Sequence, residues 1–188
     1  MDTCGTSLSK SSMVALGSLT IALGCVWTGW SAEERDYGVG RPATQEQIRA
    51  WDIDVNSVGE GLPPGQGTVK QGAQVFASKC AMCHGPTGIE GPKDKLVGGH
   101  NTLMTAKPLK TIGSYWPYAT TLYDYVHRAM PFTAPQSLTP DETYSVVAWL
   151  LFQNKIIPED MVIDAKTLPA IRMPNRDGFV RDPRPDIR

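Results

Sequence analysis

Residues 80–84 constrain this chain more than any other stretch, because they read Cys-Ala-Met-Cys-His. Two cysteines at this spacing can add to the two vinyl groups of one haem and hold it through thioether bonds. The histidine that follows directly can bind the haem iron as its proximal ligand. The motif therefore predicts one covalently bound haem c, with Cys80 and Cys83 as attachment points and His84 as a ligand of the metal.

The same cysteine spacing also occurs in zinc sites and in thioredoxin-like redox centres. A structural zinc takes four protein ligands, whereas the two remaining cysteines, Cys4 and Cys25, form no second pair of this kind. A thioredoxin-like centre would lie in a β-α-β unit, and the residues around Cys80 have a helical pattern. Haem attachment is therefore favoured over both alternatives.

Composition limits the class of protein. The 188 residues suit one domain, and the 18 basic and 19 acidic residues nearly balance. A nucleic-acid-binding protein would carry a basic excess, so no nucleic acid is expected as a partner. The 18 glycines and 15 prolines are many for a helical protein. We expect helices joined by long irregular segments, with the haem adding apolar bulk to the core.

Residues 1–32 are predicted to be a signal peptide or a membrane anchor. Lys10 precedes an apolar run at 13–30, and charged residues begin at Glu33. This order is typical of an export signal, while the length of the run is near the minimum for a membrane span. Residues 21–25 also resemble a bacterial lipoprotein box. Because c-type haem is attached outside the cytoplasm, we expect a periplasmic protein; cleavage, anchoring and lipidation all stay open.

Residues 33–67 are predicted to form an irregular arm. Thr44 and Gln47 have the spacing of a capping box and start a short helix that ends near Trp51. A run of proline and glycine at 63–67 then breaks the chain. We expect Trp51 to pack on the core and hold the arm there.

The haem domain is predicted at 68–157, with a helix at each end. Apolar residues follow helical spacing from about 68 to 80, where Gly72 suits a close crossing by another helix. The last helix starts at the Thr139–Glu142 capping box and carries an apolar run at 146–152, so it must be buried. The proline-rich tail at 158–188 is expected to wrap the domain or a partner.

A helix predicted at 119–129 ends before Met130, because Pro131 disfavours the α conformation at the preceding residue. Met130 then lies in a loop 46 residues after His84 (130 − 84), far enough to reach the opposite face of the haem. Methionine–histidine ligation raises the reduction potential and suits electron transfer. His127 and Met173 are the alternative ligands, the first on the helix and the second beyond the last helix.

The segment 112–118 is rich in glycine and aromatic residues. The indole N–H of Trp116 can donate a hydrogen bond to a haem propionate, and the hydroxyl of Tyr115 is a weaker candidate. Plain packing is the alternative, since buried tryptophan and tyrosine also need polar partners. Trp116 is therefore included among the candidate haem-binding residues.

These motifs together resemble those of class I cytochromes c. Five further stretches resemble the cytochrome subunit of bacterial sulfane/sulfite dehydrogenase in the Sox sulfur-oxidation system: Tyr37–Ala43, Trp51–Val55, Trp116–Thr121, Arg128–Phe132 and Met173–Phe179. The resemblance implies an all-α class I cytochrome c fold around one haem. It also implies that Cys80, Cys83, His84 and Met130 are the haem residues. Some members of that family carry two haems, whereas this chain has one attachment motif.

The predicted function is one-electron transfer. Two filled axial positions leave no place on the iron for a substrate, so no catalysis is expected from this chain alone. By resemblance, the electron donor is a molybdenum-cofactor dehydrogenase subunit, and a downstream cytochrome c or oxidase is the acceptor. A free-standing electron carrier is the alternative. A haem enzyme or gas sensor would need an open iron position.

Overall fold

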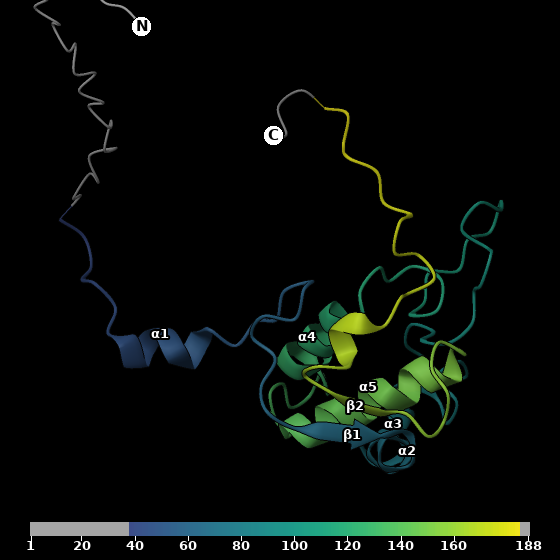
Figure 1. Cartoon of the computed structure of the whole chain (residues 1–188), viewed down its shortest axis with the longest axis horizontal. Coiled ribbons are helices and arrows are strands. Elements are labelled where there is room, and N and C mark those ends of the chain that lie inside the picture. The colour runs from purple at the N-terminus through teal and green to yellow at the C-terminus, as the bar shows by residue number, and fades with distance from the viewer. Residues whose placement is uncertain (1–37, 185–188) are drawn as a thin grey trace, which may run out of the picture. The chain divides into compact units, whose positions relative to one another are not determined.

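The structure, a computed structural model, describes residues 38–184 (Figure 1). The predicted signal peptide or anchor at 1–32 lies outside these residues. Residues 43 onward form one compact unit, and the few described residues before it are exposed. Within 38–184, no helix combines the length and the apolar character that crossing a membrane requires.

The fold is all-α, as predicted. Two helices begin at the predicted capping boxes of Thr44 and Thr139, and Thr68 caps a third helix in the same way. Thr44, Thr68 and Thr139 each accept a hydrogen bond from the backbone three residues on, and a Gln or Glu side chain closes each capping box. The α-helices are α1 (Gln45–Trp51), α2 (Val69–Lys79), α3 (Ala81–His84), α4 (Ala119–Ala129) and α5 (Pro140–Gln153).

Helices α2 and α5 cross at close range. A β-carbon at Gly72 would lie 1.9 Å from the carbonyl oxygen of Ser145, so the two backbones meet where α2 has no side chain. One turn further along, the rings of Phe76 and Trp149 stack with centroids 4.0 Å apart. The predicted role of Gly72 at a helix crossing is therefore confirmed.

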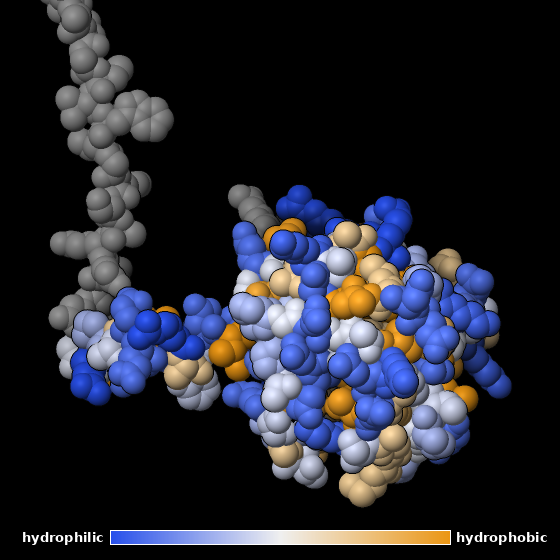
Figure 2. Space-filling view, turned by 60° about the horizontal axis from the view of Figure 1, so that its bottom comes forward, coloured by the Kyte–Doolittle hydropathy of each residue, from blue (hydrophilic) through white to orange (hydrophobic). Residues whose placement is uncertain are grey.

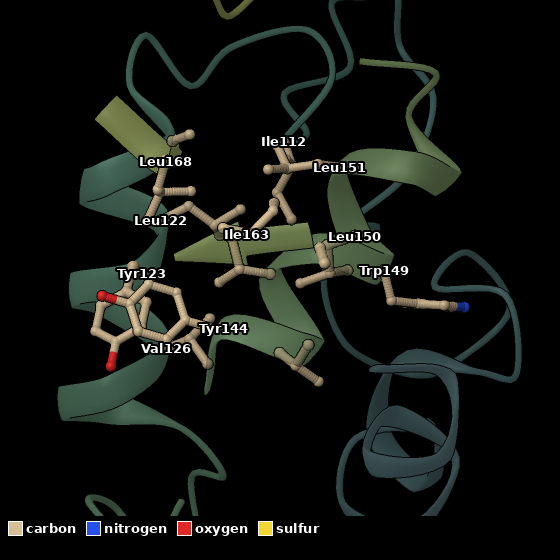
Figure 3. Packing of buried hydrophobic residues seen from close by; sticks show 14 of the residues in the cluster. Ile112, Leu122, Tyr123, Val126, Tyr144, Trp149, Leu150, Leu151, Ile163 and Leu168 are labelled. Atoms are coloured by element: carbon tan, nitrogen blue, oxygen red, sulfur yellow. The ribbon is translucent and has the colours of Figure 1, made fainter. Parts of the chain in front are cut away.

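The other face of α5 packs against α4 to form the hydrophobic core (Figure 3). Tyr123 of α4 lies beside Tyr144 of α5, with ring centroids 4.5 Å apart. Ile163 and Leu168 point into the same cluster from the C-terminal part of the chain. On the outside, apolar residues are separated by polar ones, as the face drawn in Figure 2 shows.

A two-stranded antiparallel sheet joins the predicted arm to the predicted tail. Strand β1 (Gln66–Thr68) pairs with β2 (Val162–Asp164), and the 3-10 helix η1 (Leu168–Ala170) follows. Nothing in the sequence predicts this pair, because three residues are too few for an alternating pattern. Residues 162–173 therefore belong to the core rather than to a loose tail.

The arm is fixed to the same domain by hydrogen bonds to α4. The buried Val55 donates its backbone N–H to the Asp124 carboxylate over 2.8 Å, and Thr120 donates to the carbonyl of Ser57 over 3.0 Å. The expectation that Trp51 pins the arm is wrong, since its side chain is 86% exposed. Val55 anchors the arm instead, because its side chain is buried in the core and its backbone N–H donates a hydrogen bond to the Asp124 carboxylate.

The Gly72→Ala substitution is expected to destabilise the haem-loaded protein by about 1–3 kcal/mol, because the new methyl group overlaps the Ser145 carbonyl. At an exposed helix site the same change would stabilise by about 1 kcal/mol. Ala77→Gly, on the exposed side of α2, is the control and should cost no more than about 1 kcal/mol. Denaturant unfolding measures both; a Gly72→Ala protein of unchanged stability would contradict the close crossing.

Candidate haem site

Cys80 and Cys83 lie at the junction of two helices. Cys80 ends α2, donating its N–H to the Phe76 carbonyl over 2.9 Å, and directly precedes α3, which carries Cys83 and His84. Both cysteines are half-buried, no disulfide joins them, and Cys80 packs against the hydrophobic core. Burial raises the pKa of the Cys80 thiol to about 11. The cysteines are thus presented from one short turn, as a shared haem edge requires.

His84 is oriented by the loop that follows it. Its Nδ1 lies 2.9 Å from the backbone carbonyl oxygen of Asp94. A carbonyl only accepts hydrogen bonds, so Nδ1 carries a proton, and in the neutral imidazole the lone pair is then on Nε2. A histidine that binds a metal through one nitrogen usually donates from the other in this way. This donor set fits a haem iron at Nε2.

The loop after His84 is folded back on the motif. Lys93 donates its backbone N–H to the carbonyl of Cys83 over 3.1 Å, and a β-carbon at Gly91 would lie 2.1 Å from the same oxygen. The approach is therefore possible only without a side chain at position 91. It places the Asp94 carbonyl against the imidazole of His84.

Asn154 is a positioning residue that sequence reasoning missed. Its buried side chain donates to the Leu96 carbonyl and accepts from the Gly98 N–H, both over 3.1 Å. The backbone carbonyl of Asn154 accepts a hydrogen bond from His100 Nε2 at 3.0 Å. The end of α5 thus fixes the loop that carries Asp94. The only hint in the sequence is that Asn154, a polar residue, follows an apolar helix. The same pattern is also typical of a solvent-exposed residue that caps a helix end.

Met130 leaves the helix as predicted. Its backbone is extended (φ −122°, ψ 148°) directly after α4, and its half-buried side chain packs against the same core cluster as Cys80. Met173 is 1% exposed within that core, so its surroundings give it a packing role. His127 Nδ1 is buried without a hydrogen-bond partner in the described part of the chain. Ligation by Met130 stays a prediction.

Trp116 is half-buried against the core, and its ring meets that of Tyr125 edge-to-face with centroids 5.7 Å apart. The predicted hydrogen bond from Trp116 to a haem propionate stays a prediction. The tail holds the backbone on either side of this residue, since Asn175 Nδ2 donates to the Tyr115 carbonyl over 2.8 Å and Tyr118 forms a β-bridge with Arg172. Sequence reasoning did not bring these segments together.

The comparisons with known proteins agree with this geometry. A family model described as cytochrome c matches residues 69–153. The crystal structure of the sulfane dehydrogenase SoxCD from Paracoccus pantotrophus contains a chain that is 45% identical, with a TM-score of 0.73. The match covers 79% of this chain and 74% of that one. The chain belongs to the class I cytochromes c.

A structure of thiosulfate dehydrogenase (TsdBA) from Marichromatium purpuratum also matches, at 25% identity and a TM-score of 0.34, over 45% of this chain and 18% of that one. Comparison with curated proteins gives no match.

The predicted haem c is therefore confirmed, and the cytochrome is an electron-transfer protein. When bound, the haem supplies the one-electron redox change. Of the residues described above, Cys80 and Cys83 would tether it and His84 would bind its iron, with apolar side chains of the core beside them. The predicted haem domain at 68–157 is less than half of the chain, so a match over 79% must include parts of the arm or the tail.

Met130→Ala is expected to abolish the weak near-infrared absorption band that a methionine sulfur gives with oxidised haem iron, and to let carbon monoxide bind the reduced protein. Met104→Ala is the matched control, because the Met104 side chain is 99% exposed in a surface loop. Absorption spectra of both variants decide the question. If the band persists without Met130, another residue is the ligand.

Replacing Cys80 and Cys83 together by alanine is expected to prevent folding. Cys80, Ala81, Leu96, Trp116 and Met130 are only partly buried by the protein, and an untethered haem would leave their apolar surface against water. The variant should be degraded in the periplasm, and any purified chain should lack native helical circular dichroism. A stable helical apoprotein would disprove this expectation.

Proposed function

We propose that this cytochrome accepts electrons from a molybdenum-cofactor sulfane or sulfite dehydrogenase subunit in the periplasm. The observation that carries the proposal is 45% identity, over 79% of the chain, to a chain of the sulfane dehydrogenase SoxCD. A downstream cytochrome c or oxidase would then take the electron. The export pattern at 1–32 and the attachment of c-type haem outside the cytoplasm support the periplasm as its location.

The chain's own residues suit transfer of an electron without substrate binding at the iron. The Asp94 carbonyl orients His84, which would bind the haem iron through Nε2. Met130, released from α4 into an extended conformation, provides the second ligand in this proposal. Covalent attachment at Cys80 and Cys83 keeps the cofactor in place through repeated oxidation and reduction. Filled axial positions leave outer-sphere electron transfer as the chemistry of the site.

The arm provides a surface for the dehydrogenase. None of the seven residues of α1 is buried, and Trp51 and Ile48 are exposed three positions apart on this helix. Isolated helices of fewer than about 12 residues are marginal in water, so α1 needs a protein surface to support it. We place Trp51 in a permanent interface, which typically buries more than about 1,200 Å².

Purification from native periplasm at high salt tests this function. The full-length cytochrome should co-purify with a molybdenum-containing subunit, since an apolar contact survives the screening of surface charges. Trp51→Ala should weaken that association by tenfold or more, as truncation of a buried interface tryptophan commonly does. Met104→Ala, another fully exposed apolar side chain, should leave it unchanged.

Truncating the tail at residue 158 would be a poor test, because Ile163, Leu168 and Met173 are core residues. If the intact cytochrome elutes alone even under mild salt, it is a free-standing electron carrier and the dedicated-subunit function is wrong. If Trp51→Ala associates as strongly as the full-length protein, the arm is not part of the interface.

A further inference from the structure

The last part of the tail is folded onto the segment that carries Trp116. The β-bridge between Tyr118 and Arg172 and the hydrogen bond from Asn175 to Tyr115 fix the two backbones together. The Arg176 guanidinium lies 4.1 Å from the centre of the Tyr118 ring. Phe179 meets the Tyr115 ring edge-to-face, with ring centroids 5.2 Å apart.

This arrangement gathers basic side chains on one surface, which we call the tail face. Its members are His100, Lys110, Lys155, Arg172 and Arg176. Lys110 Nζ lies 5.0 Å from the centre of the Tyr115 ring, on which the tail also packs. Within residues 38–184, Lys110, Lys155 and Arg176 form no ion pair, and Arg172 pairs with the exposed Asp177.

A hollow in the tail face is lined by two cationic side chains of this set, Lys155 and Arg172, and by His100. His100, Lys155 and Arg172 share its wall with Asn154, Ile156, Met173 and Pro174, and no carboxylate lines it. His100 Nε2 is held by the Asn154 carbonyl at 3.0 Å, and Met173 is buried beneath. The hollow is therefore a built feature of the domain, and its charge suits an acidic side chain.

The described part of the protein is nearly neutral. The described residues 38–184 contain 15 Lys and Arg and 14 Asp and Glu, a net charge of +1. The Lys and Arg side chains of the tail face outnumber the Asp177 carboxylate that pairs with Arg172. An excess of one charge on a nearly neutral protein orients an approaching partner of opposite charge and raises its association rate. Trp116 lies next to the tail face, half-buried between Tyr125 and the core, so a partner on the tail face would lie against a candidate haem-binding residue.

We propose that the tail face is the docking surface for an acidic electron-acceptor protein, one of whose carboxylates enters the hollow between Lys155 and Arg172. This inference rests on the proposed electron-transfer function and adds the chemistry of the acceptor. A nucleic acid would need a larger basic excess than +1. A membrane surface would need an apolar face beside the charges, whereas the hollow is a concave feature that fits single side chains.

Two doubly charge-reversed variants test the proposal at equal net charge. Lys110→Glu with Lys155→Glu alters the tail face. Lys70→Glu with Lys166→Glu alters two exposed lysines that lie outside it. The reduced, haem-loaded full chain of each is oxidised in stopped flow by the anion hexacyanoferrate(III) and, separately, by the cation tris(phenanthroline)cobalt(III). The ratio of the two rate constants reports the charge that the oxidant meets where electrons leave.

The tail-face variant should lower this anion-to-cation ratio by about tenfold or more at low salt, and the control variant by much less. The difference should vanish at 1 M salt, where screening is nearly complete. In NMR spectra of the wild type, the paramagnetic, redox-inert anion hexacyanochromate(III) should broaden amide signals at 98–118 and 172–179. Together these results would support the proposal.

Equal ratios in the two variants would overturn it, because the effect would then come from net charge alone. Broadening elsewhere would overturn it as well. If vesicles of phosphatidylglycerol bind the wild type through these lysines while the ratio stays unchanged, the surface is a membrane contact. Voltammetry of the wild type separates the two levels of inference: without a reversible haem couple the electron-transfer function itself fails, whatever the tail face binds.

Discussion

The crossing of α2 and α5 is the contact on which the haem site depends. Because Gly72 has no side chain, the Ser145 carbonyl can approach the α2 backbone, and Phe76 stacks on Trp149 one turn later. The next turn of α2 ends at Cys80. The position of the attachment motif is therefore set by this close helix crossing, so a shift there would displace the two cysteines that are predicted to hold the haem.

Helix α5 also positions the other parts of the site. At its far end, Asn154 holds the loop whose Asp94 carbonyl orients His84. On its other face, Tyr144 packs against Tyr123 of α4, the helix that releases Met130. One buried helix thus supports the residues that are predicted to tether the haem and to bind its iron. This explains why α5 is apolar on nearly all sides, whereas a helix with one buried face carries apolar residues on that face alone.

The sequence predicts the local features of this fold well and its long-range ones poorly. The apolar spacing from about residue 68 and the capping box at Thr139 locate two helices, and the proline after Met130 locates the end of a third, because each signal lies within a few residues of its effect. The β1–β2 pair joins positions about 95 residues apart through three residues a side, too few to leave a pattern. The burial of Asn154 and the exposure of Trp51 depend equally on distant segments, and only the folded chain reveals them.

The two extensions of the haem domain differ in a way that bears on their roles. The tail is held as far as Phe179 by several contacts that are each worth only about 1 kcal/mol: a hydrogen bond, a cation–π contact and an aromatic pair. Because they act on neighbouring residues, each lowers the entropy cost of forming the next, and the tail becomes part of the domain surface. Helix α1 has no such contacts among the described residues. A surface already ordered suits a partner that binds briefly and leaves, whereas a helix that must gain its support on binding suits one that stays.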